Sequence, residues 1–373
     1  MNRLTIAIIG AGPAGGQSGY LLAQEGYDVH LFEKNREELI GRPIQCTGIV
    51  SKNFGKLFTE DELQQFTLNR VKGASIYSLN NCLELCTDEI QAHIICRIKF
   101  DNFLVRRARM AGTHLHPAHT FQALSRRSDG KYKLTFIHDK KTVTFIADKV
   151  VGADGPLSKV AKLAHMFGER HFWYGAQAVV QGKFDPEMVE LHLGNAYPGF
   201  FAWLVPESPT LARIGVAAEK NQRQLFDKIL ATKGLSPSAI QEMQGGLIPQ
   251  FREVETEKDG IYLIGDAAMM TKQTTGGGIV MSLLAAQCLR DHFVTGVSYE
   301  KLWKKKFFKD LKTARRIRRF LNRLNDHKYD KLISIMNKPS NKELLAKIGD
   351  MDFPTKFALR LLFNDVRIIG VFF

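Results

Sequence analysis

The chain has 373 residues, a length that suits two or three domains rather than one small domain. Its 45% hydrophobic and 24% charged residues are ordinary for a globular protein and exclude a disordered or fibrous chain. The surplus of 14 positive charges points to an anionic partner, for which nucleic acid, a lipid headgroup surface and phosphorylated substrates all qualify.

The N-terminal segment predicts a strand, a glycine-rich turn, a helix and a second strand. The β-branched run 5–9 favours the first strand, residues 17–25 have helical character, and residues 28–33 favour the second strand. Together they make a βαβ unit of about thirty residues, which is the usual size of this motif.

The glycine pattern Gly10-x-Gly12-x-x-Gly15 lies between the first strand and the helix. Its glycines permit a tight turn, a close approach of a pyrophosphate to the backbone, and close packing of helix on strand. The helix N-terminus offers free N–H groups to phosphates, and Glu33 can accept hydrogen bonds from a ribose diol. The unit therefore predicts an ADP-containing dinucleotide. We expect its contacts to be Gly10, Gly12, Pro13, Ala14, Gly15, Glu33 and Lys34.

The middle of the chain predicts an inserted antiparallel sheet. A short strand at 74–78, a helix at 100–111 and a hairpin of strands 134–138 and 143–146 come first. Four further segments favour strands of a second sheet: 172–182, 188–193, 200–205 and 211–217. A buried strand at 261–265 and a helix at 279–292 follow, and the remainder is mostly helical.

Two later motifs favour FAD over NAD as the dinucleotide. Gly152-Ala-Asp154-Gly155 and Gly265-Asp266 each follow a strand, and the second motif leads to a glycine triplet. An aspartate at such a strand end can hold a ribityl hydroxyl, and a helix N-terminus after the triplet can face a flavin or pyrophosphate oxygen. The predicted contacts from these segments are Asp154, Gly155, Gly265, Asp266, Gly276, Gly277, Gly278 and Ile279. Arg97, just before the predicted helix at 100–111, completes the set of predicted FAD contacts.

The motifs together resemble those of FAD proteins of the p-hydroxybenzoate hydroxylase fold, over about residues 1–290. Two more segments resemble the geranylgeranyl reductases within that group. Gln45-Cys46-Thr47-Gly48 is similar to their Cys-x-Gly loop, and 198–206 is similar to their Pro-x-x-Tyr-x-Trp-x-Phe-Pro signature. This chain departs from the signature at Phe201, where Tyr is usual, and at Val205, where Phe is usual.

The resemblance implies an α/β fold, with a Rossmann-like FAD-binding domain, an inserted antiparallel β-sheet substrate domain and a helical C-terminal region. The FAD-binding domain is expected at 1–73, 96–165 and 246–299, the substrate domain at 74–95 and 166–245, and the basic helical region at 300–373.

The resemblance also implies an FAD-dependent oxidoreductase that reduces isolated C=C bonds of a polyprenyl, geranylgeranyl-type lipid. Non-covalent FAD would deliver a hydride to one alkene carbon, and Cys46 or water would supply a proton to the other. Cys46, which we also place next to the cofactor, could instead gate the flavin or be an inert thiol. The expected substrate contacts are Gly48, Phe201, Trp203 and Pro206. Only one dinucleotide fingerprint is present, so NAD(P)H would bind transiently or a ferredoxin would donate the electrons.

Two alternatives share this fold. A flavin-dependent monooxygenase acting on an aromatic or lipid substrate would use the same FAD motifs but needs no Cys-x-Gly loop. A prenyl-binding escort protein without redox activity would have lost FAD, and the intact Glu33, Asp154, Asp266 and glycine triplet argue against that loss.

Segment 301–323 has eleven Lys or Arg residues and one Asp. Apolar residues recur at helical spacing from Trp303 to Leu321, which predicts an amphipathic helix with a cationic face. The apolar stripe could equally pack on the protein core, whereas the charge favours an anionic membrane surface. Nucleic acid is not expected, because no recognition motif accompanies the charge.

We expect a cytoplasmic protein, peripheral on the inner face of the membrane. No signal peptide begins the chain, no apolar run is long enough to span a bilayer, and five irregularly spaced cysteines favour a reducing compartment. No metal site is expected: Cys82 and Cys86 have no second pair, and His114, His116 and His119 have no carboxylate nearby in sequence.

Overall fold

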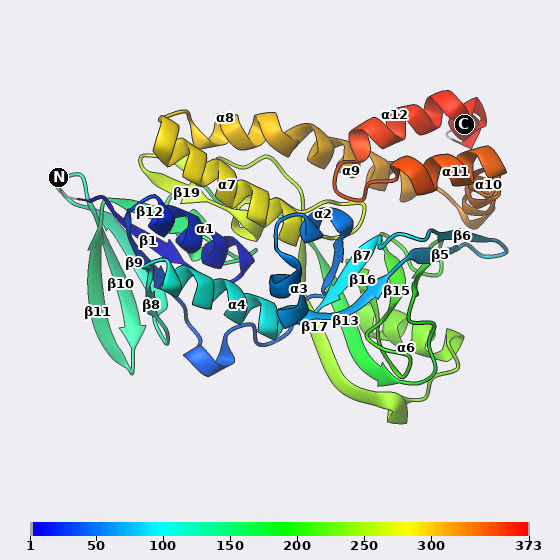
Figure 1. Cartoon of the computed structure of the whole chain (residues 1–373), viewed down its shortest axis with the longest axis horizontal. Coiled ribbons are helices and arrows are strands. Elements are labelled where there is room, and N and C mark those ends of the chain that lie inside the picture. The colour runs from blue at the N-terminus through cyan, green and yellow to red at the C-terminus, as the bar shows by residue number, and fades with distance from the viewer. Residues whose placement is uncertain (1–2, 372–373) are drawn as a thin grey trace.

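The computed structural model describes residues 3–371 and has at one end a mainly parallel sheet (Figure 1). Its strand order is β8-β2-β1-β12-β19-β18, in which only β18 pairs antiparallel. This is the doubly wound order of dinucleotide-binding folds. Residues 6–9 are all buried, as a continuous apolar run in a sheet covered on both faces requires. The strands are β1 (Thr5–Ile9), β2 (Asp28–Phe32), β8 (His114–His116), β12 (Lys149–Gly152), β18 (Glu257–Lys258) and β19 (Ile261–Leu263).

Three helices pack together against this sheet, namely α1 (Pro13–Gln24), α4 (Arg97–Met110) and α7 (Ile279–Thr295). Helices α1 and α4 approach each other closely at Gly16. A larger residue would not fit there, because a Cβ on Gly16 would lie 2.9 Å from the Leu104 Cβ. A three-stranded antiparallel sheet also packs on the parallel sheet, where Phe32 stacks on Phe136 with ring centroids 4.2 Å apart. That sheet consists of β9 (Thr120–Arg126), β10 (Tyr132–His138) and β11 (Lys141–Ala147).

A seven-stranded sheet forms the other end of the molecule, in the order β17-β13-β16-β15-β14-β5-β6. All its pairs are antiparallel except β14 with β5, which confirms the expected inserted sheet. Strand β17 crosses the predicted domain boundary at 245, so the exact domain limits stay a prediction. The strands are β5 (Gly73–Tyr77), β6 (Cys82–Cys86), β13 (His171–Gln181), β14 (Met188–His192), β15 (Phe201–Pro206), β16 (Leu211–Ala218) and β17 (Ile240–Gln250).

Shorter elements complete the fold around the two large sheets. The strands β3, β7 and β4 form a small antiparallel sheet of their own, in the order β3-β7-β4. The shorter elements are β3 (Ile49–Ser51), β4 (Thr67–Val71), β7 (Ala92–Ile95), α2 (Lys52–Gly55), α3 (Glu60–Phe66), α5 (Lys159–Leu163), α6 (Gln222–Thr232), η1 (Glu37–Leu39), η2 (Pro237–Ala239) and η3 (Gly265–Ala268).

The C-terminal region is helical, as expected, and lies along one side of the molecule (Figure 1). Its first part is a continuous helix of α8 (Tyr299–Trp303), a π-helical turn η4 (Lys304–Phe308) and α9 (Lys309–Leu321). The remaining elements are α10 (Asp326–Met336), α11 (Pro339–Ile348), α12 (Pro354–Asn364) and η5 (Val366–Val371).

The apolar stripe of the basic segment is part of the protein core. Trp303, Phe307 and Leu311 belong to the main core cluster and are at most 2% exposed. Of the two interpretations of this stripe, packing on the core is therefore the one the structure supports. No helix within residues 3–371 has both the length and the apolar character needed to cross a bilayer.

Candidate functional site

Four of the predicted motifs meet at the carboxyl edge of the parallel sheet. The backbone N–H of Gly10 donates to the Phe32 carbonyl at 2.8 Å, and that of Ala153 donates to the Ile9 carbonyl at 2.8 Å. Ile264, just after β19, donates its N–H to the Gly152 carbonyl at 3.0 Å. The ends of β1, β2, β12 and β19 are thus side by side, where doubly wound folds bind their ligands.

The glycine-rich turn leaves open space at the start of α1. Gly10 has a φ of +103°, and a Cβ there would lie 2.4 Å from the Ala153 carbonyl oxygen. A Cβ on Gly15 would lie 1.8 Å from the Gly10 carbonyl oxygen, whereas a Cβ on Gly12 would meet nothing within 4 Å. Helix α1 begins at Pro13 without a side-chain cap, so its first N–H groups face this space. The turn therefore fits a phosphate group.

Glu33 is fixed over the same turn by two backbone contacts. Its Oε2 accepts the Ala11 N–H at 2.9 Å, and its Oε1 accepts the Asn35 N–H at 2.9 Å. A carboxylate oxygen can accept further hydrogen bonds, so this arrangement fits a ribose diol. Lys34 is exposed beside it.

Asp154 already makes several contacts within the chain. Its Oδ1 accepts the Ser158 hydroxyl at 2.6 Å, and its Oδ2 accepts the N–H groups of Lys159 at 2.7 Å and Val160 at 3.1 Å. Burial raises the pKa of this carboxyl group. Asp154 thus joins the turn after β12 to the start of α5. The contacts of Asp154 with a ribityl hydroxyl and of Gly155 with FAD stay predictions.

Asp266 lies at the other glycine-containing turn, next to the triplet. Its Oδ1 accepts the Thr271 hydroxyl at 3.1 Å, and burial raises the pKa of the carboxyl group. A Cβ on Gly278 would lie 2.9 Å from that Oδ1, and one on Gly276 would lie 3.1 Å from the Phe200 ring. The triplet therefore joins Asp266 to the aromatic part of the seven-stranded sheet, and α7 begins directly after it at Ile279.

Arg170 joins the two aspartate turns and was not foreseen from the sequence. Its guanidinium donates to the carbonyls of Phe167 at 2.8 Å, Pro156 at 2.8 Å and Ala267 at 2.7 Å. Burial lowers the pKa of Arg170 to about 10, although the carboxylates of Asp154 and Asp266 favour its charge. No local motif marks this residue, because the contacts that join the two turns are with Pro156 and Ala267, 14 and 97 residues away.

Arg97, the first residue of α4, faces the Cys46 loop. It forms a two-pronged ion pair with Asp101, with Nε–Oδ1 at 3.0 Å and Nη2–Oδ2 at 2.9 Å. The Cys46 thiol is close enough to interact with the Arg97 guanidinium. The predicted Arg97 and Cys46 are therefore brought together, although they are far apart in the sequence.

A buried arginine fixes the Cys46 loop from its other side. Arg213 is 3% exposed and donates from Nη1 to the carbonyls of Thr47 and, at 3.1 Å, Ile95. Gly48 donates its N–H to the Cys46 sulfur at 3.3 Å and has a φ of +73°. A Cβ on Gly48 would lie 2.5 Å from both the Ile95 oxygen and the arginine Nη1, so only glycine fits.

Trp203 is connected to the same loop through Gln177. The indole Nε1 donates to the Gln177 Oε1 at 3.0 Å, and the Thr47 hydroxyl donates to the same oxygen at 2.7 Å. Phe201 and Trp203 are 7% and 6% exposed and belong to one core cluster of the sheet. Strand β15, which ends at Pro206, thus supports the loop, and its role as the wall of a substrate channel stays a prediction.

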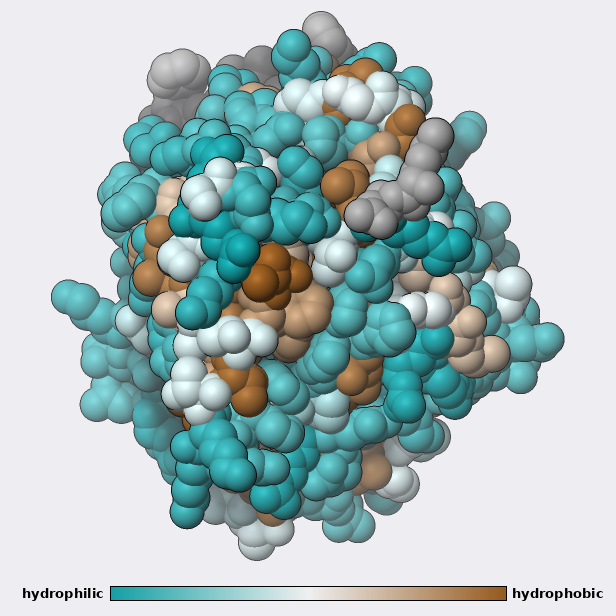
Figure 2. All heavy atoms as spheres, turned by 90° about the vertical axis from the view of Figure 1, so that its left-hand side faces the viewer, coloured by the Kyte–Doolittle hydropathy of each residue, from teal (hydrophilic) through white to brown (hydrophobic). Residues whose placement is uncertain are grey.

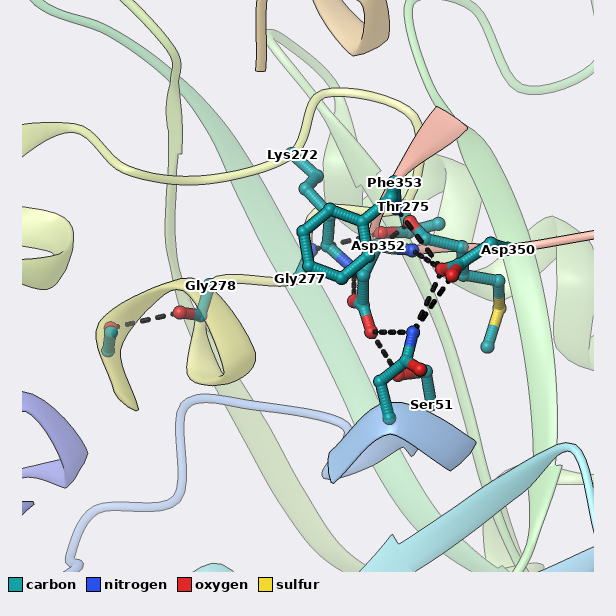
Figure 3. A network of polar contacts seen from close by, with 11 residues as sticks. Ser51, Lys272, Thr275, Gly277, Gly278, Asp350, Asp352 and Phe353 are labelled. Atoms are coloured by element: carbon teal, nitrogen blue, oxygen red, sulfur yellow. Dashed lines mark hydrogen bonds and ion pairs between the residues drawn. The ribbon is translucent and has the colours of Figure 1, made fainter. Parts of the chain in front are cut away.

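A buried polar network lies beside the glycine triplet, and no motif pointed to it (Figure 3). The Lys272 ammonium forms an ion pair with Asp352, and these side chains are 6% and 0% exposed. Asp352 also accepts the Ser51 hydroxyl, and Asn53 donates to Asp350 at 3.0 Å. The network joins the loop before the triplet to α2 and to the segment before α12.

The ammonium of Lys272 is also close to the triplet itself. A Cβ on Gly277 would lie 3.4 Å from its Nζ, and the Lys272 N–H donates to the Gly277 carbonyl at 3.1 Å. A positive charge is therefore held directly beside the predicted flavin contacts.

Arg318 holds the triplet loop from α9. It is 2% exposed and donates to the carbonyls of Gln273 at 2.9 Å, Thr274 at 2.8 Å and Phe200 at 3.1 Å. Its guanidinium carbon is 4.6 Å from the centroid of the Phe200 ring, a cation–π distance, and burial lowers its pKa to about 10. One arginine of the expected solvent-facing cationic surface is thus a buried part of the site.

Comparison with known proteins agrees with this geometry. A family model described as FAD binding domain matches residues 3–289. The digeranylgeranylglycerophospholipid reductase 2 of Methanothermobacter thermautotrophicus is 27% identical, over 89% of this chain and 91% of that protein. The digeranylgeranylglycerophospholipid reductase of Methanosarcina acetivorans is 27% identical, over 96% of each chain.

Solved structures share the fold at lower identity. A geranylgeranyl bacteriochlorophyll reductase-like protein from Thermoplasma acidophilum superimposes with a TM-score of 0.81 and 20% identity, covering 99% of this chain and 98% of that one. The flavin-dependent brominase Bmp2 superimposes with a TM-score of 0.71 and 16% identity, covering 98% of this chain and all of that one. These likenesses confirm the expected architecture.

Proposed function

Since the chain belongs to the FAD binding domain family and is an FAD-dependent oxidoreductase, we propose that it reduces isolated C=C bonds in the polyprenyl chains of a geranylgeranyl-type lipid. Relatives of matching length named as digeranylgeranylglycerophospholipid reductases support this substrate class. The observation that carries the proposal is the Cys46 loop, which Arg97 and Arg213 hold between the FAD motifs and the aromatic strand β15.

The residues at the carboxyl edge of the sheet fit FAD. The open space at Gly12 takes the pyrophosphate, Glu33 takes the ribose, and the triplet 276–278 with Asp266 borders the flavin end. When bound and reduced, FAD supplies a hydride. NAD(P)H or a ferredoxin-type protein would supply the electrons that reduce it.

The chain's own residues supply the rest of the reaction. The Cys46 thiol holds a proton at Sγ for the second alkene carbon, so that hydride and proton together saturate the bond. Gly48 and Thr47 keep this thiol in place, because their contacts with Arg213 and Gln177 leave the loop little freedom. Phe201, Trp203 and Pro206 are buried residues of β15, and Trp203 is linked to the loop through Gln177. In this proposal they wall a channel beside the loop, where a prenyl chain would gain favourable burial.

The test of this function is the mass of the product. We expect the dithionite-reduced protein to add two hydrogens to each double bond that it reduces in digeranylgeranylglycerophospholipid, as measured by mass spectrometry. Cys46→Ala should slow this reduction about 10²-fold, the usual contribution of a positioned proton donor, with unchanged flavin absorbance. A product that gains oxygen would instead show a monooxygenase, and equal turnover of the variant would show that the thiol holds no essential proton.

The cofactor assignment has its own test. We expect the protein to purify yellow with non-covalent FAD, and Glu33→Ala to weaken FAD binding about tenfold to a hundredfold, because hydrogen bonds to a charged group are lost. Fluorescence titration of the flavin-depleted protein measures this. Glu38→Ala, at an exposed position in the same loop, should leave the affinity unchanged. A colourless protein that does not bind added FAD would contradict the assignment.

An anionic membrane surface is the partner that the outer face of the basic segment supports. Its exposed side chains, free to approach lipid headgroups, include Lys301, Lys305, Lys306, Lys309, Arg316, Arg319 and Arg323. Each contributes on the order of 1 kcal/mol near such a surface. Because the apolar stripe is buried, the segment would adsorb through charge alone and would not insert. The proposed location is therefore peripheral, on the cytoplasmic side of the membrane.

A further inference from the structure

Two histidines and an aspartate come together at the amino ends of β2 and β8. Asp28 and His30 are two residues apart on β2, so their side chains share one face of the strand. His114 is the parallel partner of His30 on β8. His114 has no carboxylate nearby in sequence, but the pairing of the two strands brings Asp28 close to it.

The ligand atoms of these residues are spaced as a metal site requires. The distance from the Asp28 Oδ1 is 3.1 Å to the His30 Nε2 and 3.8 Å to the His114 Nε2, and all three atoms lie within 4.8 Å of one another. Zinc bonds of about 2.0–2.2 Å in tetrahedral geometry separate neighbouring ligand atoms by roughly 3.4 Å. We propose that Asp28, His30 and His114 bind a divalent transition metal ion, zinc in the first place, with water completing the coordination.

Neighbouring residues orient two of the three ligands. The other ring nitrogen of His30, Nδ1, is 2.9 Å from the Nε2 of His116. In the tautomer that carries its proton on Nδ1, His30 donates a hydrogen bond to His116 and leaves its own Nε2 for the metal. The second oxygen of Asp28 accepts the Thr5 hydroxyl at 3.0 Å. Such contacts around a metal site fix the tautomer of a histidine and the direction of a carboxylate.

The types of ligand atom at this site indicate which metal ion it would bind. Two imidazoles and one carboxylate suit zinc and its neighbours in the transition series, whereas magnesium and calcium prefer oxygen ligands. Access is open, since the His114 side chain is 62% exposed and that of Asp28 is 36% exposed. Figure 2 views the molecule from this side and shows a mainly hydrophilic surface with small, separate hydrophobic patches.

The position of the set indicates a structural role. The FAD motifs lie at the carboxyl ends of the parallel strands, whereas these ligands lie at their amino ends. A metal here would not reach the reaction; it would tie the three-residue edge strand β8 to β2. Bound to the folded state only, it would stabilise the protein against unfolding.

The test is a zinc titration of the FAD-loaded protein after treatment with a chelator. We expect one equivalent of zinc to bind by isothermal titration calorimetry and to raise the melting temperature, and magnesium to do neither. His114→Ala and Asp28→Asn should each weaken zinc binding at least tenfold and abolish the rise in melting temperature. Both residues are partly exposed, so the variants should fold, and retained flavin colour checks this.

His327→Ala is the matched control, because it removes an exposed histidine from α10, outside the cluster, and should leave zinc binding unchanged. Two results would overturn the proposal. One is no zinc binding by the unaltered protein. The other is binding that both cluster variants retain, which would place the metal elsewhere, for example on the exposed thiol of Cys86.

Discussion

Asp352→Asn should lower the free energy of unfolding by about 3–5 kcal/mol, because it leaves the buried Lys272 ammonium without its counter-charge. It should also weaken FAD binding, since a displaced lysine would disturb Gly277 and the triplet. Urea denaturation measures the first effect, and flavin titration measures the second.

Two further variants separate stability from cofactor binding. Replacing both partners, with Lys272→Met and Asp352→Leu, should recover most of the lost stability, because an apolar pair needs no counter-charge. FAD affinity should stay low in this double variant if the ammonium itself contributes to binding. Asp227→Asn breaks the exposed pair with Arg223 and should cost less than about 1 kcal/mol. A cost equally small for Asp352→Asn would show that the buried pair does not stabilise the fold.

Arg318→Met should lower the free energy of unfolding by about 3 kcal/mol or more, because three carbonyls lose their donor. Two of these hydrogen bonds are buried, and each buried group left unpaired costs about 1–3 kcal/mol. The triplet loop and the Phe200 backbone would no longer be held together by one side chain. FAD affinity should therefore fall together with the free energy of unfolding. Arg318→Lys should recover little of this, since an ammonium cannot reproduce the planar fork of donors.

The neighbouring position provides the control for this variant. Arg319 is exposed on the same helix, so Arg319→Met should change the free energy of unfolding by less than about 0.5 kcal/mol. The same denaturation curves compare the two. If both variants were equally mild, the contacts of Arg318 would not stabilise the site.

The parts of the site that the sequence predicted are those that depend on local chemistry. Gly10 and Gly15 reveal the turn because no side chain fits at either position, and Glu33 follows a recognisable strand. The same local patterns predicted β1, α1, β2, α4, β19 and α7 to within a few residues, whereas short elements such as β3 and β4 were not predicted. The doubly wound order then places the strand ends together, as the structure confirms.

The parts that sequence reasoning missed depend on contacts between distant segments. Arg170, Arg213 and Arg318 each bind backbone carbonyl groups from other elements. Every residue has such a carbonyl, so these partners cannot be recognised from the residue types in the sequence. Arg318 had one usable signal: it is four residues after Ala314 and seven after Leu311, and therefore on the buried stripe. Its positive charge, however, favoured a position on the solvent-exposed cationic face.

The ion pair at the triplet has a consequence for how the protein matures in a cell. Ser51 and Asp352, which meet there, are 301 residues apart along the chain. Asp352 must therefore have been synthesised before the buried surroundings of Lys272 can form. Nascent chains that still lack it would expose an unpaired lysine beside an unfinished cofactor pocket, so flavin capture would follow synthesis and not accompany it. The supply of FAD would then act on finished chains, and its shortage would show as complete but colourless protein.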